Sequence, residues 1–224
     1  MHSVYLVPLG RGRFELYTEP PDAAAGVDGH RRGYLRRRLQ HLHERWREVV
    51  HVARQDDPAR GRVARVRDWM VSRAAETIAE QRTLWSLRQI GEATLIHPSD
   101  LEEAHATATR RHLLASARRH HGLWLILDTM VLIASSVFIL VPGPNVIAYY
   151  FLVRAVGHFL SWRGARQALD GTAWRMQPEP ALAELGRLAD LPRESRAPRV
   201  EAIASRLKLP RLAAFFDRAA VPAR

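Results

Sequence analysis

The sequence lacks cysteine and has a single lysine, Lys208, among its 224 residues. Without cysteine the chain has no disulfide framework, no thiolate nucleophile and no cysteine-ligated zinc site. It also lacks a glycine-rich phosphate loop, a Ser-His-Asp pattern and a lysine placed as a nucleophile. We therefore expect that the protein is not an enzyme and that it needs no cofactor.

Acidic residues are in the minority, with 23 Asp and Glu against 34 Lys and Arg, for a net charge of +11. Residues 31–73 contain 13 arginines and 5 acidic residues, so this segment alone carries +8. Such a balance suits anionic partners. Anionic lipid headgroups are favoured over nucleic acid, because no motif of a DNA-reading helix accompanies the arginines. A solvated basic surface that binds nothing is the simpler alternative.

Eleven histidines raise the question of a metal site, but their spacing does not favour one. His120 and His121 are adjacent, and neighbours on a regular helix point in different directions. His105 and His112 are seven residues apart and belong to no carboxylate–histidine motif. We predict no metal site.

We expect neither a signal peptide nor a transit peptide, because a strand-like pattern begins at about residue 3. Residues 3–8 and 13–18 are rich in β-forming side chains, and Gly10-Arg11-Gly12 lies between them. Two such segments around a glycine turn predict a β-hairpin. A two-stranded hairpin is marginal alone, so it must dock on the rest of the protein.

Apolar side chains recur at three- and four-residue spacing along much of the remaining chain, which is typical of amphipathic helices. His97-Pro98-Ser99-Asp100 resembles a helix start, because Ser99 or Asp100 can accept hydrogen bonds from the first free amides. Helices are expected over 31–54, 60–82, 83–91, from about 100 to 121, and over 179–190, 196–207 and 210–219.

Long apolar runs are confined to residues 122–168. Residues 123–141 include one charged side chain, Asp128, and a helix of that length reaches roughly 28 Å, close to the ~30 Å hydrocarbon core of a bilayer. Pro142-Gly143-Pro144-Asn145 breaks the helix, and Pro144 suits the first turn of a second helix over 144–162. The pattern predicts a two-helix transmembrane hairpin. A buried helix pair in a soluble protein is the alternative.

Three ionisable side chains fall inside this predicted hairpin: Asp128, Arg154 and His158. Asp128 lies 15 residues before Gly143 and His158 lies 15 after it, so an antiparallel pair of helices places them at the same depth. Arg154 is one helical turn nearer the loop, on the face of His158. We expect Asp128 to meet Arg154, His158 or both. Such a cluster is either a proton or ion pathway or a structural ion pair.

The sequence resembles the mitochondrial potassium–proton exchange-related proteins of fungi and plants over roughly residues 3–170. The strongest likeness begins at the predicted turn and continues through Tyr149–Ala168, where Arg154, His158, Arg163 and Gly164 stand at recurring positions of that family. Weaker likeness involves the following segments: Val4–Leu9, Phe14–Tyr17, Trp46 and Ile96–Pro98. The resemblance implies a membrane protein linked to potassium–proton exchange.

These observations together predict a mainly α membrane protein with a short N-terminal β-hairpin. Residues 1–121 would form a cytoplasmic basic helical domain, 122–168 the membrane hairpin and 169–224 a helical tail. The positive-inside rule places both termini on the cytoplasmic or matrix side. A bacterial plasma membrane is favoured, and family analogy points to the mitochondrial inner membrane.

We expect a component or regulator of exchange, with potassium ions and protons as cargo if transport is direct. Because two helices are too few to enclose an ion path, transport would need a homo-oligomer or a partner transporter. The alternative function is a membrane-anchored scaffold that binds anionic lipid or a protein partner and transports nothing.

Overall fold

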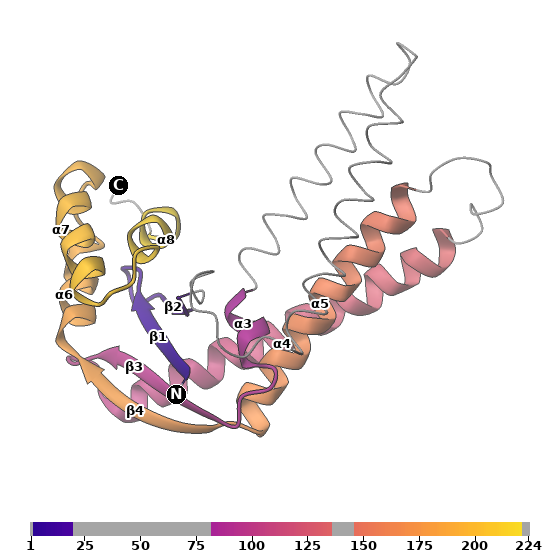
Figure 1. The fold of residues 1–224 in the computed structure, drawn as a ribbon, viewed down its shortest axis with the longest axis horizontal. Helices are drawn as coiled ribbons and strands as arrows, with labels where there is room; N and C mark the ends of the chain where they lie inside the picture. Colours follow the sequence, from indigo (N-terminus) through magenta and orange to yellow (C-terminus); the bar gives the residue numbers. More distant parts are fainter. Residues whose placement is uncertain (1, 20–81, 136–145, 221–224) are drawn as a thin grey trace, which may run out of the picture. The chain divides into compact units, whose positions relative to one another are not determined.

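The computed structural model describes residues 2–19, 82–135 and 146–220 (Figure 1). Residues 1–19 and 73–224 belong to one compact unit, and 20–72 form a second. The following predictions lie outside the described residues, in whole or in part: the helix over 31–54, the helix over 60–82 except its last residue, residues 136–141 of the first predicted membrane helix, and the turn Pro142-Gly143-Pro144-Asn145. All described residues belong to the first unit.

A four-stranded mixed sheet organises this unit, with strand order β2-β1-β3-β4. Strand β1 (His2–Pro8) pairs antiparallel with β2 (Phe14–Tyr17) on one side and parallel with β3 (Glu92–Pro98) on the other. Strand β4 (Ala173–Glu179) pairs parallel with β3 at the edge. The sheet therefore joins three segments that are distant in the sequence.

The predicted β-hairpin is confirmed by the antiparallel pairing of β1 and β2. Its turn has three consecutive residues with positive φ, at +85° for Gly10, +52° for Arg11 and +69° for Gly12. Glycine adopts this region at little cost. The Leu9 amide donates to the Arg13 carbonyl at 2.8 Å, which closes the turn.

The expectation of a mainly α fold with a single β-hairpin is wrong in one respect, because the fold is mixed α/β, although mostly helical. Strands β3 and β4 were not expected. The segment read as a helix start, His97-Pro98, instead ends β3, where Pro98 stands opposite Glu179 of β4. These strands exist through pairing with distant segments, which local sequence patterns do not reveal.

The two faces of the sheet are covered by different helices. Val4, Leu6 and Leu95 pack with α3 (Arg82–Leu87), α4 (Glu103–Ser135) and α5 (Val146–Asp170). Val7 and Ile96 pack with three C-terminal helices, α6 (Pro180–Leu188), α7 (Arg193–Arg206) and α8 (Leu212–Ala219). This division follows from the alternation of side chains along a strand.

The C-terminal helices lie close to where the sequence predicts them. Helix α6 begins at Pro180, whose missing amide hydrogen costs nothing at the first helical position. The Glu179 carboxylate accepts a hydrogen bond from the Ala181 amide at 3.0 Å and caps the helix. These local signals explain why the C-terminal helices can be predicted from the sequence.

Helix α4 is one continuous helix, so the predicted boundary between residues 121 and 122 falls inside it. Its first half is polar, and only residues 123–135 of its described length belong to the apolar run. In the described parts of the chain, no helix combines the length and the apolar character needed to cross a membrane. The predicted transmembrane hairpin is therefore not supported within these residues.

Candidate functional site

Helices α4 and α5 lie side by side and run antiparallel, as the order of their contacts shows (Figure 1). Arg118 approaches Asp170 at 3.6 Å near the sheet, and Asp128 meets Arg154 further along. Beyond the sheet the pair continues as a two-helix arm, which we call the α4–α5 arm and define as residues 121–135 and 146–162. The predicted ionisable residues all lie on it.

The structure brings together Asp128, Arg154 and His158. The Arg154 Nε donates to the Asp128 Oδ2 at 3.2 Å, and the His158 Nε2 lies 3.5 Å from the same oxygen. The Asp128 side chain is only 1% exposed. Their contact is the one expected from the spacing about Gly143, whereas their functional role stays a prediction.

Arg154 is held by neighbours on both helices. Its Nη1 donates to the Tyr150 hydroxyl at 3.2 Å, and its guanidinium carbon lies 5.2 Å from the centre of the Trp124 ring. Burial lowers the pKa of Arg154, but the Tyr150 hydroxyl and the Asp128 carboxylate outweigh it and the pKa is raised. Arg154 is therefore a permanent positive charge beside Asp128.

The other two members of the cluster have pKa values shifted toward their neutral forms. Burial raises the pKa of Asp128, and the charge and hydrogen bond of Arg154 oppose this rise. Burial, followed by the charges of Arg154 and His120, lowers the pKa of His158 to about 4. The shifts bring the pKa values of a carboxyl and an imidazole closer together, which favours proton exchange between them.

A fourth residue, His121, was missed as a member of this cluster. Its Nδ1 lies 2.9 Å from the Nδ1 of His158, within hydrogen-bond distance, and both rings are buried. Burial, then His158 and His120, lowers the pKa of His121 to about 4. A signal was available, because His121 precedes Asp128 by seven residues and two helical turns place both on one face. From the sequence alone, His121 was considered as a metal ligand and not as a neighbour of Asp128.

These two histidines predict a pH-dependent stability. Because folding lowers the pKa of His121 and His158 from 6.5 to about 4, the unfolded chain binds more protons between these values. The contribution of the two neutral histidines to the free energy of unfolding is fully present above pH 6.5 and is lost as the pH falls toward 4. We expect the free energy of unfolding to fall below pH 6.5, by at most about 1.4 kcal/mol per pH unit for each histidine. Urea unfolding across pH 7 to 5 measures it.

The control for this prediction is the double variant His121→Asn/His158→Asn. Its free energy of unfolding should depend less steeply on pH between pH 6.5 and 5 than that of the wild type. Asp128 acts in the opposite direction at lower pH, because its raised pKa lets the folded state take up a proton first. A slope that is identical in the wild type and the double variant would contradict the assignment.

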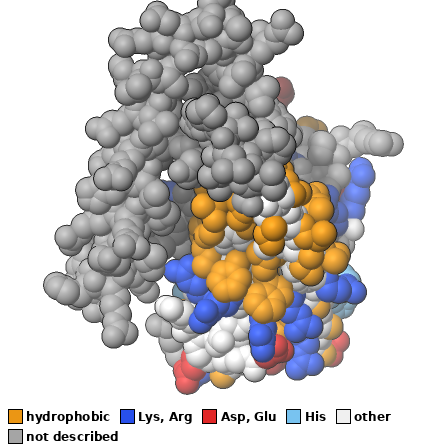
Figure 2. Space-filling view, turned by 90° about the vertical axis from the view of Figure 1, so that its right-hand side faces the viewer, with side chains coloured by type: hydrophobic (Ala, Val, Ile, Leu, Met, Phe, Trp, Pro, Cys, Tyr) orange, Lys and Arg blue, Asp and Glu red, His pale blue; other side chains and the backbone are white. Residues whose placement is uncertain are grey.

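The arm exposes an unusual amount of apolar surface. Figure 2 shows hydrophobic side chains gathered in one patch with Lys and Arg side chains at its border. Exposure reaches 70% for Leu123, 66% for Ile133 and 64% for Met130. We call this surface the apolar face of the arm; its exposed large hydrophobic residues are Leu123, Trp124, Ile126, Leu127, Met130, Ile133, Leu152, Val153, Val156 and Phe159.

The remaining predicted site residues lie elsewhere. Arg163 is exposed on α5, and Gly164 is buried against α3. A Cβ on Gly164 would lie 2.6 Å from the carbonyl carbon of Leu84 and closer still to its oxygen. Gly164 therefore allows two backbones to approach, a packing role rather than a chemical one.

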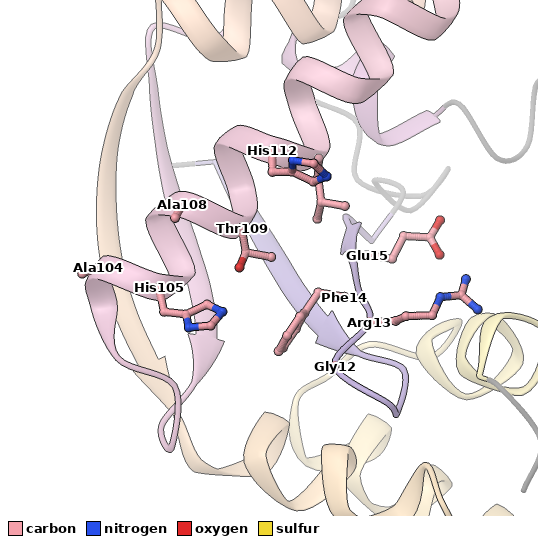
Figure 3. A pocket seen from close by; sticks show the side chains of 10 residues that line it. Gly12, Arg13, Phe14, Glu15, Ala104, His105, Ala108, Thr109 and His112 are labelled. Carbon is pink, nitrogen blue, oxygen red and sulfur yellow. The ribbon is translucent and has the colours of Figure 1, made fainter.

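An open groove of about 990 Å³ lies apart from the cluster, between the first half of α4 and the β-hairpin (Figure 3). His105 and His112 line it from α4, opposite Arg13 and Glu15 of the hairpin. Among the described residues, no group of three or more His, Asp and Glu side chains is arranged to hold a metal ion.

Comparison with known proteins gives one match. No curated protein and no solved structure matches the chain. Residues 71–170 match the family described as mitochondrial K+-H+ exchange-related. The match includes α3, β3, α4 and α5, and so covers the whole ionisable cluster. The resemblance noted in the sequence is thereby confirmed over residues 71–170, which are similar to the mitochondrial K+-H+ exchange-related family.

Proposed function

We propose that this protein works at a membrane as a component or regulator of potassium/proton exchange, with the α4–α5 arm as its working element. One observation carries the proposal: Asp128 and His158 are buried beside the partly exposed Arg154, between two helices whose outer surface is apolar and exposed. The family description, which refers to potassium–proton exchange, supports it.

The apolar face supports contact with lipid. Contiguous exposed apolar patches on soluble proteins mark surfaces that bind a protein, a ligand or a membrane. A net charge of +11 favours anionic headgroups among these partners. Trp124 and Trp162, one on each helix, are residues that favour the boundary between lipid and water. We therefore place the apolar face against lipid.

The cluster supplies chemistry suited to protons. A carboxyl and an imidazole with converging pKa values can exchange a proton, whereas Arg154 keeps a fixed charge that balances the Asp128 carboxylate. Nothing in this role makes or breaks a covalent bond other than one to a proton, so we propose that the protein is not an enzyme. Because two helices do not enclose an ion path, direct transport requires a homo-oligomer or a partner transporter.

We place both termini on one side, cytoplasmic or matrix, because α4 and α5 are antiparallel and both begin or end at the sheet. A bacterial plasma membrane is proposed from the arginine-rich composition, while the family description refers to mitochondria. Potassium ions and protons are the proposed cargo of the exchange.

Membrane attachment is tested by flotation with vesicles that contain anionic lipid. The double variant Ile126→Asn/Met130→Asn removes two side chains that are 61% and 64% exposed on the apolar face. We expect the variant to bind the vesicles at least tenfold more weakly than the wild type. Two apolar side chains buried in lipid contribute about 1.4 kcal/mol or more to the binding free energy.

The matched control is Ala104→Asn/Ala108→Asn, which changes two exposed residues of α4 at the same four-residue spacing. It should float like the wild type. A wild-type chain that stays with the soluble fraction, or an Ile126/Met130 variant that floats unchanged, would contradict the lipid contact.

A second function is a membrane-anchored scaffold that binds anionic lipid or a protein partner without transport. The size of the apolar face favours it, because an anchor needs apolar area and no titrating group. Potassium-dependent proton flux in vesicles separates the two functions. If neither Asp128→Asn nor His158→Ala changes this flux, the scaffold role stands and transport does not.

A further inference from the structure

We propose that His121, His158 and Asp128 form a proton relay inside the α4–α5 arm, with His121 as its access point. This inference rests on the proposed function and deepens it, because it adds a residue and a direction of proton movement to the cluster.

The relay follows from two consecutive short distances. The Nδ1 atoms of His121 and His158 are 2.9 Å apart, and the other ring nitrogen of His158 lies 3.5 Å from the Asp128 carboxylate. His158 therefore uses both of its nitrogens, one toward each neighbour. The first distance permits a hydrogen bond, and the second needs only a small side-chain movement to become one.

Burial increases along this line of residues. His121 is 8% exposed, His158 is 5% and Asp128 is 1%. His120 precedes them and is exposed, and the centres of its ring and the His121 ring are 5.2 Å apart. Protons from solvent therefore reach the relay at the His120–His121 end, and Asp128 is the innermost position.

The contacts favour one pair of tautomers for the two neutral rings. A hydrogen bond between two Nδ1 atoms needs one proton and one lone pair. If His158 carries its proton on Nε2, facing the Asp128 carboxylate, then its Nδ1 is the acceptor and His121 is protonated on Nδ1. The Nε2 of His121 then has a free lone pair with which to take up a proton.

The transfer balances without any co-reactant. A proton binds to Nε2 of His121, and the Nδ1 proton of His121 passes to Nδ1 of His158. The Nε2 proton of His158 then passes to the Asp128 carboxylate. One proton has entered at His121 and one has reached Asp128, and both histidines are neutral again.

The groups around the relay favour this direction. Burial, together with the charges of Arg154 and His120, lowers the pKa of His158 and disfavours a positive charge on its ring. Burial also raises the pKa of Asp128, although the charge and hydrogen bond of Arg154 oppose this rise. The proton therefore does not rest on the imidazoles. Trp124 is stacked near His158, with ring centres 6.3 Å apart, and Tyr150 holds Arg154.

Nitrogen NMR of the full-length protein with labelled histidines tests the hydrogen-bonded chain directly. We expect His121 to carry its proton on Nδ1 and His158 on Nε2 at neutral pH, with a coupling between the two Nδ1 nuclei across the hydrogen bond. Rings that both carry the proton on Nε2, without such a coupling, would overturn the relay.

Proton flux in vesicles tests whether the relay is used. His121→Asn keeps a nitrogen donor near the position of Nδ1 but lacks the second nitrogen, so the cluster should persist while the relay is blocked. We expect at least a tenfold loss of potassium-dependent proton flux, with the exposed His112→Asn on α4 unchanged.

The outcomes separate the relay from the proposed function. Full flux in His121→Asn together with lost flux in Asp128→Asn would overturn the relay and leave the exchange function in place. Absence of flux in the wild type would remove direct transport, and the tautomers measured by NMR would then decide the relay alone.

Discussion

Gly164→Ala is expected to destabilise the protein by about 3 kcal/mol or more, at the upper end of what overpacking costs. The new Cβ would lie 2.6 Å from the carbonyl carbon of Leu84, and an obstruction by backbone cannot rotate away. Helix α3 would have to move off α5. That movement would break the bond from Trp85 Nε1 to the Ser161 hydroxyl, 2.8 Å long, and expose the fully buried Leu87.

Gly91→Ala is the matched control, because nothing lies within 4 Å of its added Cβ and its φ is not in the left-handed region. We expect a change within about 0.5 kcal/mol. Urea unfolding followed by tryptophan fluorescence measures both variants. Equal stabilities would mean that α3 does not pack against α5 as described.

Asp128→Asn is expected to reduce potassium-dependent proton flux by at least tenfold, within the range of about 10²–10⁴ by which a positioned acid or base assists proton transfer. The change keeps the shape of the side chain and an oxygen that can accept from Arg154, but it removes the group that titrates. Membrane binding should be unaffected, because Asp128 is buried and takes no part in the apolar face. The loss would therefore be chemical rather than structural.

Local signals in the sequence were enough for part of the fold. Gly10 and Gly12 identify the hairpin turn, and Glu179-Pro180 marks the start of α6 through a cap and a first-turn proline. Strand β3 carries no such signal. It is a strand because it lies between β1 and β4, and its partner in β4 is about 80 residues away, as in the pairing of Thr94 with Arg175. Pairing over such distances is not encoded in neighbouring residues.

The contacts of the candidate site were predicted from the spacing of its residues about the turn, not from a local sequence motif. Equal spacing on both sides of Gly143 placed Asp128 beside His158, and one helical turn placed Arg154 within reach. The same reasoning did not extend to His121, because α4 was expected to end at about residue 121. A continuous α4 aligns His121 with Asp128, so the missed residue follows from the misplaced helix boundary.

The most direct test of the central claim compares potassium-dependent proton flux in vesicles that contain the wild type, Asp128→Asn or Asp170→Asn. Asp170 is the matched control, since its side chain is 61% exposed, lies on α5 and is paired with Arg118. We expect flux in the wild type and in Asp170→Asn, and at least a tenfold loss of flux in Asp128→Asn. Equal flux in all three would contradict the central claim.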